Sequence, residues 1–135
     1  MASPIRCPCG SGEEYVDCCG RLHSGQASAA TAVALMRSRF SAFAVSASAY
    51  LLETWHPSTR PLDLTLDDHI RWTRLEVVEV VDGGMFDLTG VVEFRAHYRL
   101  AGSRGVLHER STFIRHEGRW RYLDGISPEA EPVPQ

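Results

Sequence analysis

The spacing of apolar residues changes once along this chain, near residue 75, and this change restricts the fold more than any other feature of the sequence. Before it, apolar side chains recur every three or four positions, at Val33, Met36, Phe40, Phe43 and Ala47. That repeat is typical of an amphipathic helix. After it, apolar and polar residues alternate, most regularly over 91–100 (VVEFRAHYRL), as in a strand with one buried face. Helices followed by consecutive strands predict an α+β domain.

Turn and cap residues divide the two parts into elements. We expect the first helix to begin at Ser28 or Thr31, a second helix over 47–55 that ends before Pro57, and a short helix over 62–73 capped by Thr65. Residues 66, 70 and 72 of that short helix would face inward. Four strands joined as hairpins should follow, over 75–81, 91–100, 106–116 and 119–125. The prediction is therefore a curved antiparallel sheet with helices on one face, and a cavity between them is the default ligand site.

Size and charge restrict the class of protein. The 135 residues are enough for one domain with a small appendage, and 44% apolar with 23% charged residues is a globular composition. The apolar runs are too short to span a membrane, and the first residues lack the pattern of a secretory signal, so we expect a cytoplasmic protein. A net charge of −3 argues against nucleic-acid binding, which needs a concentrated basic surface.

All four cysteines lie in the stretch CPCGSGEEYVDCCG, at residues 7–20. The surrounding segment, 1–25, has too few large apolar residues to form a core and needs another source of order. Disulfides between neighbouring cysteines have unsuitable geometry, although a pair such as Cys7 and Cys18 remains open, and a reducing compartment argues against a permanent bridge. A redox motif would require C-x-x-C in a βαβ unit, and the spacing here is different.

A metal ion suits this spacing better. Two cysteines on a turn and two more after a short excursion, Cys7, Cys9, Cys18 and Cys19, can surround one ion tetrahedrally with four thiolates. Zinc is the natural ion for such a closed set, and iron stays open as an alternative. His23 can substitute for one thiolate. Because a closed set leaves no position for a substrate, we expect a structural site rather than a catalytic one.

The cysteine stretch resembles the SEC-C motif, a small metal-binding module best known at the C-terminus of the preprotein translocase ATPase. By that resemblance the four cysteines are the ligands, and Ser11 and Tyr15 match the motif's polar and aromatic positions. In the translocase the module recognises a secretion chaperone and binds near ribosomes through a basic surface. This chain carries Glu13, Glu14 and Asp17 where basic residues are expected, which departs from that pattern.

A second resemblance extends over nearly the whole chain. The stretches TAVALMRSRFSAFA (31–44), YLLETWHPSTR (50–60), VVEFRAHYRLAG (91–102) and HERSTFIRHEGRWRYLDG (108–125) are similar to the YchJ-like family of uncharacterised bacterial proteins. The resemblance implies a SEC-C motif over 1–25 and, over 28–126, a domain similar to nuclear transport factor 2, a cone of curved sheet covered by helices. Such domains often form homodimers through the outer face of the sheet. We expect the Pro-rich residues 127–135 to be a mobile tail.

Alternation assigns candidate residues to the inner face of the cone. Aromatic residues and carboxylates share this face, and two carboxylates among aromatic rings can act as acid and base. The candidates from the strands are Tyr98, Glu109, Ser111, Trp120, Tyr122 and Asp124, and Trp55 joins them from the second helix. Arg39, at the edge of the first helix's apolar stripe, can pair with Glu109 or Asp124, and in that case these charges belong to the core instead.

Three functions are compatible with these features. The first is an adaptor that binds protein partners, in which the metal site is structural or recognises the partner. The second is a small-molecule enzyme or ligand-binding protein that uses the cone, with Glu109 or Asp124 as general base. The third is redox sensing by the thiols, which has the least support. We expect an adaptor, because the closed metal site is the only sharp motif.

Overall fold

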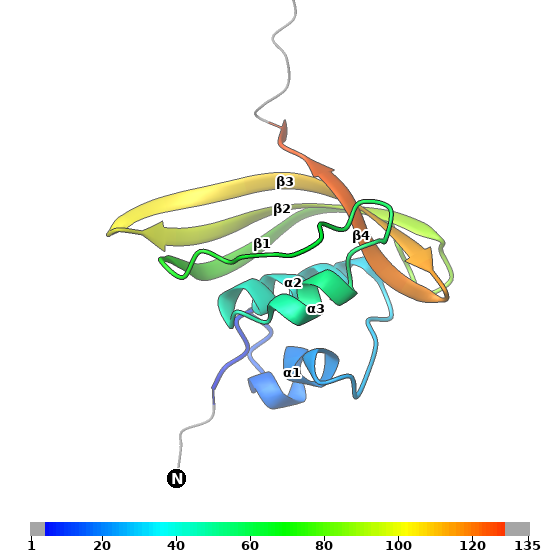
Figure 1. Cartoon of the computed structure of the whole chain (residues 1–135), viewed down its shortest axis with the longest axis horizontal. Helices are drawn as coiled ribbons and strands as arrows, with labels where there is room; N and C mark the ends of the chain where they lie inside the picture. Colours follow the sequence, from blue (N-terminus) through cyan, green and yellow to red (C-terminus); the bar gives the residue numbers. More distant parts are fainter. Residues whose placement is uncertain (1–4, 129–135) are drawn as a thin grey trace, which may run out of the picture.

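The computed structural model describes residues 5–128 and arranges them in three layers (Figure 1). A sheet of four antiparallel strands forms one layer, two helices cover one of its faces, and the cysteine segment lies on the far side of these helices. The strands lie in the order β1-β2-β3-β4. The elements are η1 (Tyr15–Asp17), α1 (Cys19–His23), α2 (Ala32–Ala44), α3 (Ser48–Glu53), β1 (Ile70–Asp82), β2 (Thr89–Leu100), β3 (Ser103–His116) and β4 (Arg119–Ile126). The predicted α+β class with a curved sheet is confirmed.

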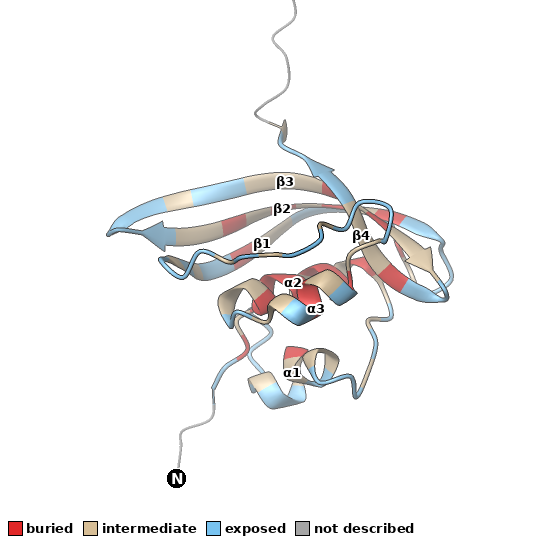
Figure 2. Ribbon diagram, in the orientation of Figure 1, coloured by how far each residue is buried: buried red, intermediate tan, exposed pale blue. Residues whose placement is uncertain are grey.

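Helix α2 occupies the middle layer and is buried on two sides. It begins at a capping residue, since the Thr31 Oγ1 accepts a hydrogen bond from the Ala34 N–H at 3.1 Å. Leu35, Met36 and Phe40 pack against the sheet. Ser38 and Ser41, on the other side, are also fully buried, although they are polar. A helix buried on both sides must be covered by two different layers, and Figure 2 shows these buried positions along α2.

Strand β2 follows the predicted alternation most closely. In β2, residues Val92, Phe94 and Ala96 are buried and their neighbours are not. Tight two-residue turns join β2 to β3 and β3 to β4, and both residues of each turn have positive φ angles: 51° and 81° at Ala101 and Gly102, 54° and 81° at Glu117 and Gly118. Such turns match the right-handed twist of a hairpin.

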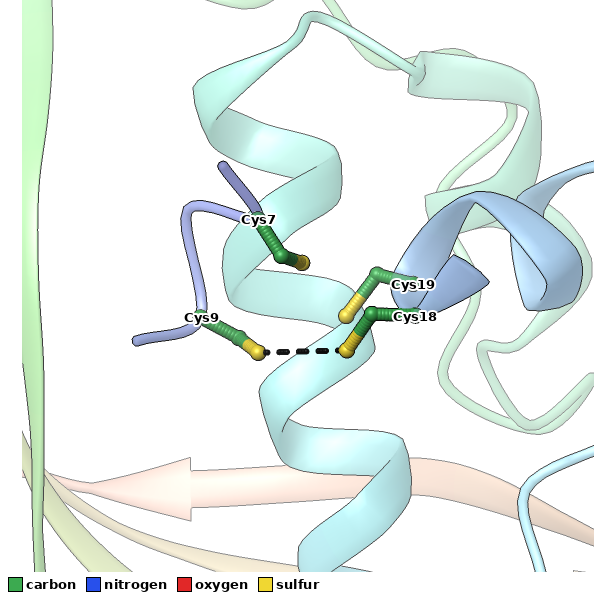
Figure 3. Close-up of side chains that lie close together, drawn as sticks. All are labelled: Cys7, Cys9, Cys18 and Cys19. Atoms are coloured by element: carbon green, nitrogen blue, oxygen red, sulfur yellow. Dashed lines mark hydrogen bonds between the residues drawn. The ribbon is translucent and has the colours of Figure 1, made fainter. Parts of the chain in front are cut away.

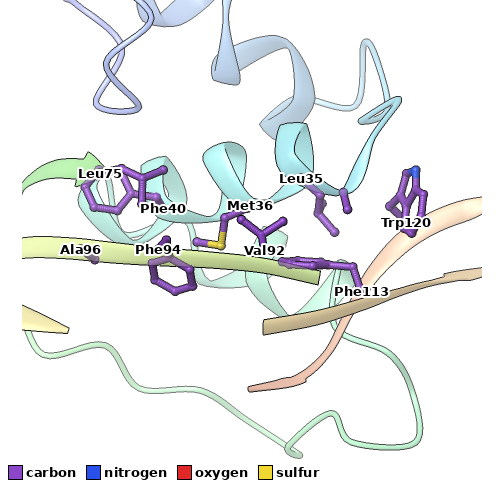
Figure 4. Packing of buried hydrophobic residues seen from close by; sticks show 10 residues of the cluster. Leu35, Met36, Phe40, Leu75, Val92, Phe94, Ala96, Phe113 and Trp120 are labelled. Atoms are coloured by element: carbon purple, nitrogen blue, oxygen red, sulfur yellow. The ribbon is translucent and has the colours of Figure 1, made fainter. Parts of the chain in front are cut away.

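The main core fills the space between α2 and the inner face of the sheet (Figure 4). Phe40 from α2 and Phe113 from β3 are its largest fully buried side chains. The Trp120 indole N–H closes one end, where it donates to the carbonyl of Ala30 at 3.1 Å. The remaining members are Ala32, Leu35, Met36, Leu75, Val92, Phe94 and Ala96.

The outer face of the sheet carries a group of ion pairs. The His108 Nε2 lies 2.7 Å from a carboxylate oxygen of Glu93, and Arg110 contacts the other oxygen of Glu93 at 3.0 Å and Glu79 at 3.1 Å. The hydrogen bond with His108 is the main reason that the pKa of Glu93 is lowered. Whether a second copy of the chain packs on this face stays a prediction.

The predicted helix over 62–73 is wrong. Residues 63–67 have no regular secondary structure, and β1 starts at Ile70, so that Trp72 belongs to the sheet and pairs with Tyr98 of β2. Leu64 and Leu66 both pack on the cluster around Leu51. A short helix there would have little stability of its own, whereas strand pairing gains a ladder of hydrogen bonds.

Within residues 5–128, no helix is long and apolar enough to cross a bilayer. The predicted mobile tail lies largely outside the described residues, which end at residue 128.

Candidate metal centre and cone pocket

The four cysteine sulfurs converge on one point (Figure 3). Cys7 and Cys9 come from a turn near the N-terminus, and Cys18 and Cys19 come from the start of α1. All four sulfurs lie within 4.8 Å of one another, and Cys7, Cys9 and Cys19 are buried. The structure therefore brings together every cysteine that the sequence proposed as a ligand.

The spacing of these sulfurs fits a tetrahedral metal ion and does not fit a disulfide. Four sulfurs at about 2.3 Å from a zinc ion would lie about 3.8 Å from one another. The Cys9 and Cys18 sulfurs are 3.7 Å apart, whereas a disulfide bond measures about 2.05 Å. All four thiols are free. The geometry thus fits zinc, and iron with four thiolate ligands would fit as well.

Two hydroxyl groups support the sulfurs from outside. The Ser11 Oγ lies 3.2 Å from the Cys18 sulfur and also accepts a hydrogen bond from the Glu13 N–H at 3.2 Å. The Ser41 Oγ of α2 lies 3.5 Å from the Cys7 sulfur. Groups of this kind orient the ligands of a metal and stabilise the charge on the thiolates.

The thiols of Cys9 and Cys19 differ in pKa. A hydrogen bond from Cys19 is the main reason that the pKa of Cys9 is lowered, to about 4. The same hydrogen bond, together with burial, raises the pKa of Cys19. Four thiolates this close together repel one another strongly unless a cation lies between them. A divalent metal ion would provide that cation and would favour the deprotonated form of the cysteines.

His23 is not positioned as a substitute ligand. Its Nδ1 lies 2.5 Å from the Tyr15 hydroxyl and its Nε2 lies 2.8 Å from the Ser38 carbonyl oxygen. Because the carbonyl oxygen only accepts, Nε2 donates and Nδ1 accepts from Tyr15. Tyr15 and His23 thus connect the cysteine segment to α2, which gives the aromatic motif position a structural role.

Around this link, the cysteine segment packs tightly on α2 and α3. Ser38 and Ser41 of α2 are each 0% exposed: the Ser41 Oγ lies beside the Cys7 sulfur, and the Ser38 Oγ is hydrogen-bonded to the Tyr50 hydroxyl of α3 at 2.7 Å. Leu22 of α1 packs on the cluster of Ala42, Tyr50 and Leu51. The cysteine segment is therefore an integral third layer of the domain and not an appendage.

The opposite side of the cysteine segment is open to solvent. Glu13, Glu14 and Asp17 are all exposed there. Val16, between them, is 65% exposed, and Ile5 is 72% exposed. Acidic and apolar side chains are thus presented together around the candidate metal centre.

A cavity of about 250 Å³ lies on the other side of α2, between the helix and the inner face of the sheet. Its wall is mainly aromatic, and three polar side chains, Arg39, Glu109 and Ser111, interrupt this wall. Leu107, which is 42% exposed, marks the side on which the cavity approaches the surface. The aromatic residues are Phe40, Phe43, Trp55, Trp72, Phe94 and Tyr122.

Arg39 is buried in this wall, but it is not paired as expected. Among the described residues, no carboxylate lies within ion-pair distance of its guanidinium group. Its Nη1 instead donates to the Leu51 carbonyl oxygen at 2.8 Å and to the Thr54 Oγ1 at 2.7 Å. The guanidinium carbon lies 5.2 Å from the centre of the Trp55 ring and 4.6 Å from that of Tyr122. Burial lowers the pKa of Arg39 to about 10, so it stays charged at neutral pH.

Glu109 is held by hydroxyl groups. The Ser111 Oγ donates to its Oε2 at 2.5 Å, and the Tyr122 hydroxyl donates to the same oxygen at 3.4 Å. Burial is the main reason that the pKa of Tyr122 is raised, and the nearby Glu109 raises it further. Gly125 leaves room for this arrangement, because a Cβ at that position would overlap the Glu109 carboxylate.

The segment that follows α3 places Trp55 beside the cavity. Residues 54–56 run beside β4: the Tyr122 N–H donates to the Thr54 carbonyl at 2.8 Å, and the His56 N–H donates to the Tyr122 carbonyl at 2.8 Å. Trp55 and Tyr122 therefore lie opposite each other, with ring centres 5.2 Å apart.

Three predicted pocket residues do not line the cavity. Trp120 is buried in the core beyond it, and Tyr98 packs on Trp72 at the far end of the sheet. Asp124 is exposed, because an irregularity in β4 pairs Thr112 with Asp124 but Phe113 with Tyr122. The extra residue turns Asp124 to the outer face, so the strict alternation that predicted it fails.

Several residues of the cavity wall are absent from the predicted set. Trp72 is one of them, because the pattern around it predicts a helix. Met36 and Phe43 lie on the predicted apolar stripe of α2, so their position was available from the sequence. Leu107 shares the inner face with Glu109, two residues away, and the same alternation would have found it.

Comparisons with known proteins agree with both parts of the structure. The family model described as "YchJ, middle NTF2-like domain" matches residues 31–125, and the SEC-C motif matches residues 6–21. A UPF0225 protein of Streptomyces coelicolor is 56% identical over 119 residues, which cover 88% of this chain and 93% of the relative. A UPF0225 protein of Corynebacterium efficiens is 53% identical over 121 residues, 90% of this chain and 92% of the relative.

Two solved structures have the same architecture. The solution structure of a SEC-C motif containing protein from Rhodopseudomonas palustris is 36% identical, with a TM-score of 0.78 over 91% of this chain and 98% of the other. The crystal structure of a SEC-C motif containing protein from Psychrobacter arcticus is 28% identical, with a TM-score of 0.72 over 96% of this chain and 84% of the other. The chain therefore belongs to the YchJ-like family of UPF0225 proteins, in which a SEC-C motif accompanies a domain similar to nuclear transport factor 2.

Proposed function

We propose that this protein binds a small organic molecule in the cavity between α2 and the sheet, and that its four cysteines hold one structural zinc ion. One observation carries the first part: the cavity is open enough for a ligand, and its two charged residues, Arg39 and Glu109, are not paired with each other. An ion pair between Arg39 and Glu109 would instead have satisfied both charges within the protein. Pockets with aromatic walls and a few polar groups are typical ligand sites.

The structural role of the metal follows from the position of its site. The four thiolates of Cys7, Cys9, Cys18 and Cys19 would complete a tetrahedral shell and leave no open position for a substrate. The site also lies on the opposite side of α2 from the cavity. Its effect on the pocket is therefore to hold α2 in place. The cytoplasm, which keeps thiols reduced, is the compartment we propose for such a protein.

The metal is tested by elemental analysis of protein purified under reducing conditions. We expect about one zinc ion per chain, and loss of that zinc in the Cys18→Ser, Cys19→Ser double variant. Iron in the same ratio would change the identity of the metal but retain the site. Wild-type protein that contains neither metal would refute the assignment.

The pocket is tested with an uncharged aromatic probe, 2-naphthol, by NMR of the indole N–H groups. The chain has three tryptophans, of which Trp55 and Trp72 line the cavity, whereas Trp120 donates to a backbone carbonyl outside it. We expect the first two signals to shift on binding and the third to stay unchanged. The Ala96→Phe variant, which fills the cavity from β2, should abolish the shifts. Equal shifts of all three signals would contradict a pocket-specific ligand.

The adaptor function remains as a second candidate, supported by the exposed surface around the cysteine site. Val16 is 65% exposed between acidic residues, an arrangement suited to a protein partner with apolar and basic groups. By motif resemblance the partner would be a secretion chaperone or the ribosome. Affinity capture with wild type and with Val16→Arg tests this, with Leu62→Arg, at another exposed apolar position, as the control. Partners retained by the control and lost by Val16→Arg would support the adaptor.

Catalysis in the cavity would use Glu109 as the general base. Its free carboxylate oxygen faces the same wall as Arg39, and the exposed Asp124 cannot act with it. We therefore propose ligand binding as the basic activity of the pocket.

A further inference from the structure

Arg39 presents one unused edge to the cavity. Its side chain is 4% exposed, and Nη1 is fully occupied by the Leu51 carbonyl and the Thr54 hydroxyl. Within residues 5–128, its Nε and Nη2 have no hydrogen-bond partner. These two nitrogens form the edge of a guanidinium group that binds a carboxylate through two parallel hydrogen bonds.

The aromatic neighbours of Arg39 leave only that edge available. The rings of Trp55 and Tyr122 lie against the guanidinium group, with centres 5.2 Å and 4.6 Å from its central carbon. Such contacts stabilise a buried cation but do not neutralise its charge. The positive charge of Arg39 is therefore held in place and remains available to an anionic group.

Glu109 presents the opposite charge in the same way. Both of its hydrogen bonds, from Ser111 and from Tyr122, go to Oε2. Its Oε1 accepts no hydrogen bond from any residue in the described part of the chain. Tyr122 separates the two charges, because its ring contacts Arg39 and its hydroxyl contacts Glu109. The cavity wall thus carries one positive and one negative group at separate places.

Resting on the pocket function proposed above, we propose that the ligand is a small zwitterion with an apolar or aromatic body. Its carboxylate binds the free edge of Arg39, its ammonium group binds Oε1 of Glu109, and its body packs on the rings of Phe40, Trp72 and Phe94. A ligand with a single charge would leave one wall charge buried against an apolar group, which is unfavourable.

The volume of the cavity limits the size of this ligand. An engineered cavity of about 150 Å³ holds one benzene molecule. The cavity here, about 250 Å³, therefore has room for one ring and a short chain that carries the two charged groups. Aromatic amino acids have this size and this chemistry, and we use L-phenylalanine as the probe.

The experiment compares three probes of nearly the same shape by isothermal titration with the full chain. L-Phenylalanine carries both charges, 3-phenylpropionate lacks the ammonium group, and 2-phenylethylamine lacks the carboxylate. We expect L-phenylalanine to bind at least about tenfold more tightly than either of the others. The signals of Trp55 and Trp72 should shift in the same titration, which places the ligand in the cavity.

Two variants separate the roles of the charges. Glu109→Gln keeps the size of the side chain and should weaken the binding of L-phenylalanine about tenfold or more. The affinity for 3-phenylpropionate should stay unchanged or increase. Asp124→Asn removes a carboxylate that lies outside the cavity and should change nothing. Arg39→Lys keeps the charge but loses the double hydrogen bond, and it should weaken both carboxylate probes.

The outcomes distinguish this inference from the pocket function. Equal affinity for the three probes would overturn the proposal that the ligand is a zwitterion. Equal affinity of wild type and Glu109→Gln for L-phenylalanine would do the same. Either result would leave the pocket function intact. Binding of 2-naphthol without binding of any charged probe would also overturn the zwitterion and leave the pocket function intact. If neither 2-naphthol nor any charged probe shifts the two cavity tryptophans, the pocket function itself is refuted.

Discussion

Removal of the metal should destabilise the whole domain and not only the segment that carries the cysteines. Within residues 5–25, the only buried residues are Cys7, Cys9 and Cys19. Without an ion these thiols have little to hold them together, because the segment has no apolar core of its own. Loss of its order would remove Cys7 from the buried Ser41 hydroxyl and His23 from the Ser38 carbonyl oxygen. A bound metal would therefore contribute to the stability of a layer that it does not touch directly.

The contacts between the two layers give the size of the effect. The hydrogen bond from His23 to the Ser38 carbonyl, 2.8 Å long, is worth about 1 kcal/mol net. Burial of Leu22 on the cluster around Leu51 is worth about 2 kcal/mol. A loss of about 3 kcal/mol in a chain of this length lowers the melting temperature by roughly 10 °C.

The near-ultraviolet circular dichroism of the tryptophans measures this effect cleanly. All three tryptophans lie in the cone, at Trp55, Trp72 and Trp120, so their signal reports the domain and not the cysteine segment. The metal is removed with a chelator under reducing conditions, and the loss is verified by elemental analysis. The Cys9→Ser, Cys18→Ser double variant serves as the control, since the chelator should not change its melting temperature further. A metal-free wild type that melts within about 2 °C of the loaded protein would refute the reasoning.

Three further substitutions test other contacts of the structure. The hydrogen bond with His108 lowers the pKa of Glu93, so this stabilisation is present above the unfolded pKa of about 4.3 and is lost as the pH falls through the lower folded value. In urea unfolding, the difference in stability between wild type and Glu93→Gln should therefore narrow as the pH falls from about 6 to about 3, and a constant difference would contradict this. Gly125→Ala should push the Glu109 carboxylate aside and weaken L-phenylalanine in calorimetry several-fold, whereas unchanged binding would place the ligand elsewhere. Ser11→Ala removes the hydroxyl that lies 3.2 Å from the Cys18 sulfur, and it should lower the affinity for zinc about 10–100-fold, as measured by competition with a chelator.

The sequence predicts the parts of this fold that depend on local periodicity. The alternation in β2 identifies Val92, Phe94 and Ala96 as buried, and the structure agrees. The same alternation in β3 places Glu109 and Ser111 on the inner face, where they line the cavity. Cysteine spacing predicts the convergence of the four sulfurs, because a metal site depends mainly on which residues can reach one point.

The parts that sequence could not predict depend on tertiary contacts. Asp124 changes face at an irregularity in β4, and nothing in the local sequence marks that position. Arg39 was correctly expected to point inward, but its acceptors are the carbonyl of Leu51 and the hydroxyl of Thr54, which only the packing of α3 against α2 brings within reach. The spacing of apolar residues at 70 and 72 fits a helix as well as a strand, and the pairing of β1 with β2 decides between them.

Helix α2 connects the two candidate sites, and its geometry explains why they are chemically separate. At 100° per residue, Ser38 and Ser41 lie on the face toward the cysteines, while Arg39 and Phe40 lie on the face toward the cavity. The four cysteines lie on the other side of α2 from the cavity, so a metal bound by them would not contact a ligand in the cavity. It can act only through the position of α2, and with it the position of Arg39. A metal-binding segment that orders the wall of a binding pocket from behind accounts for a closed thiolate site in the same chain as an open cavity.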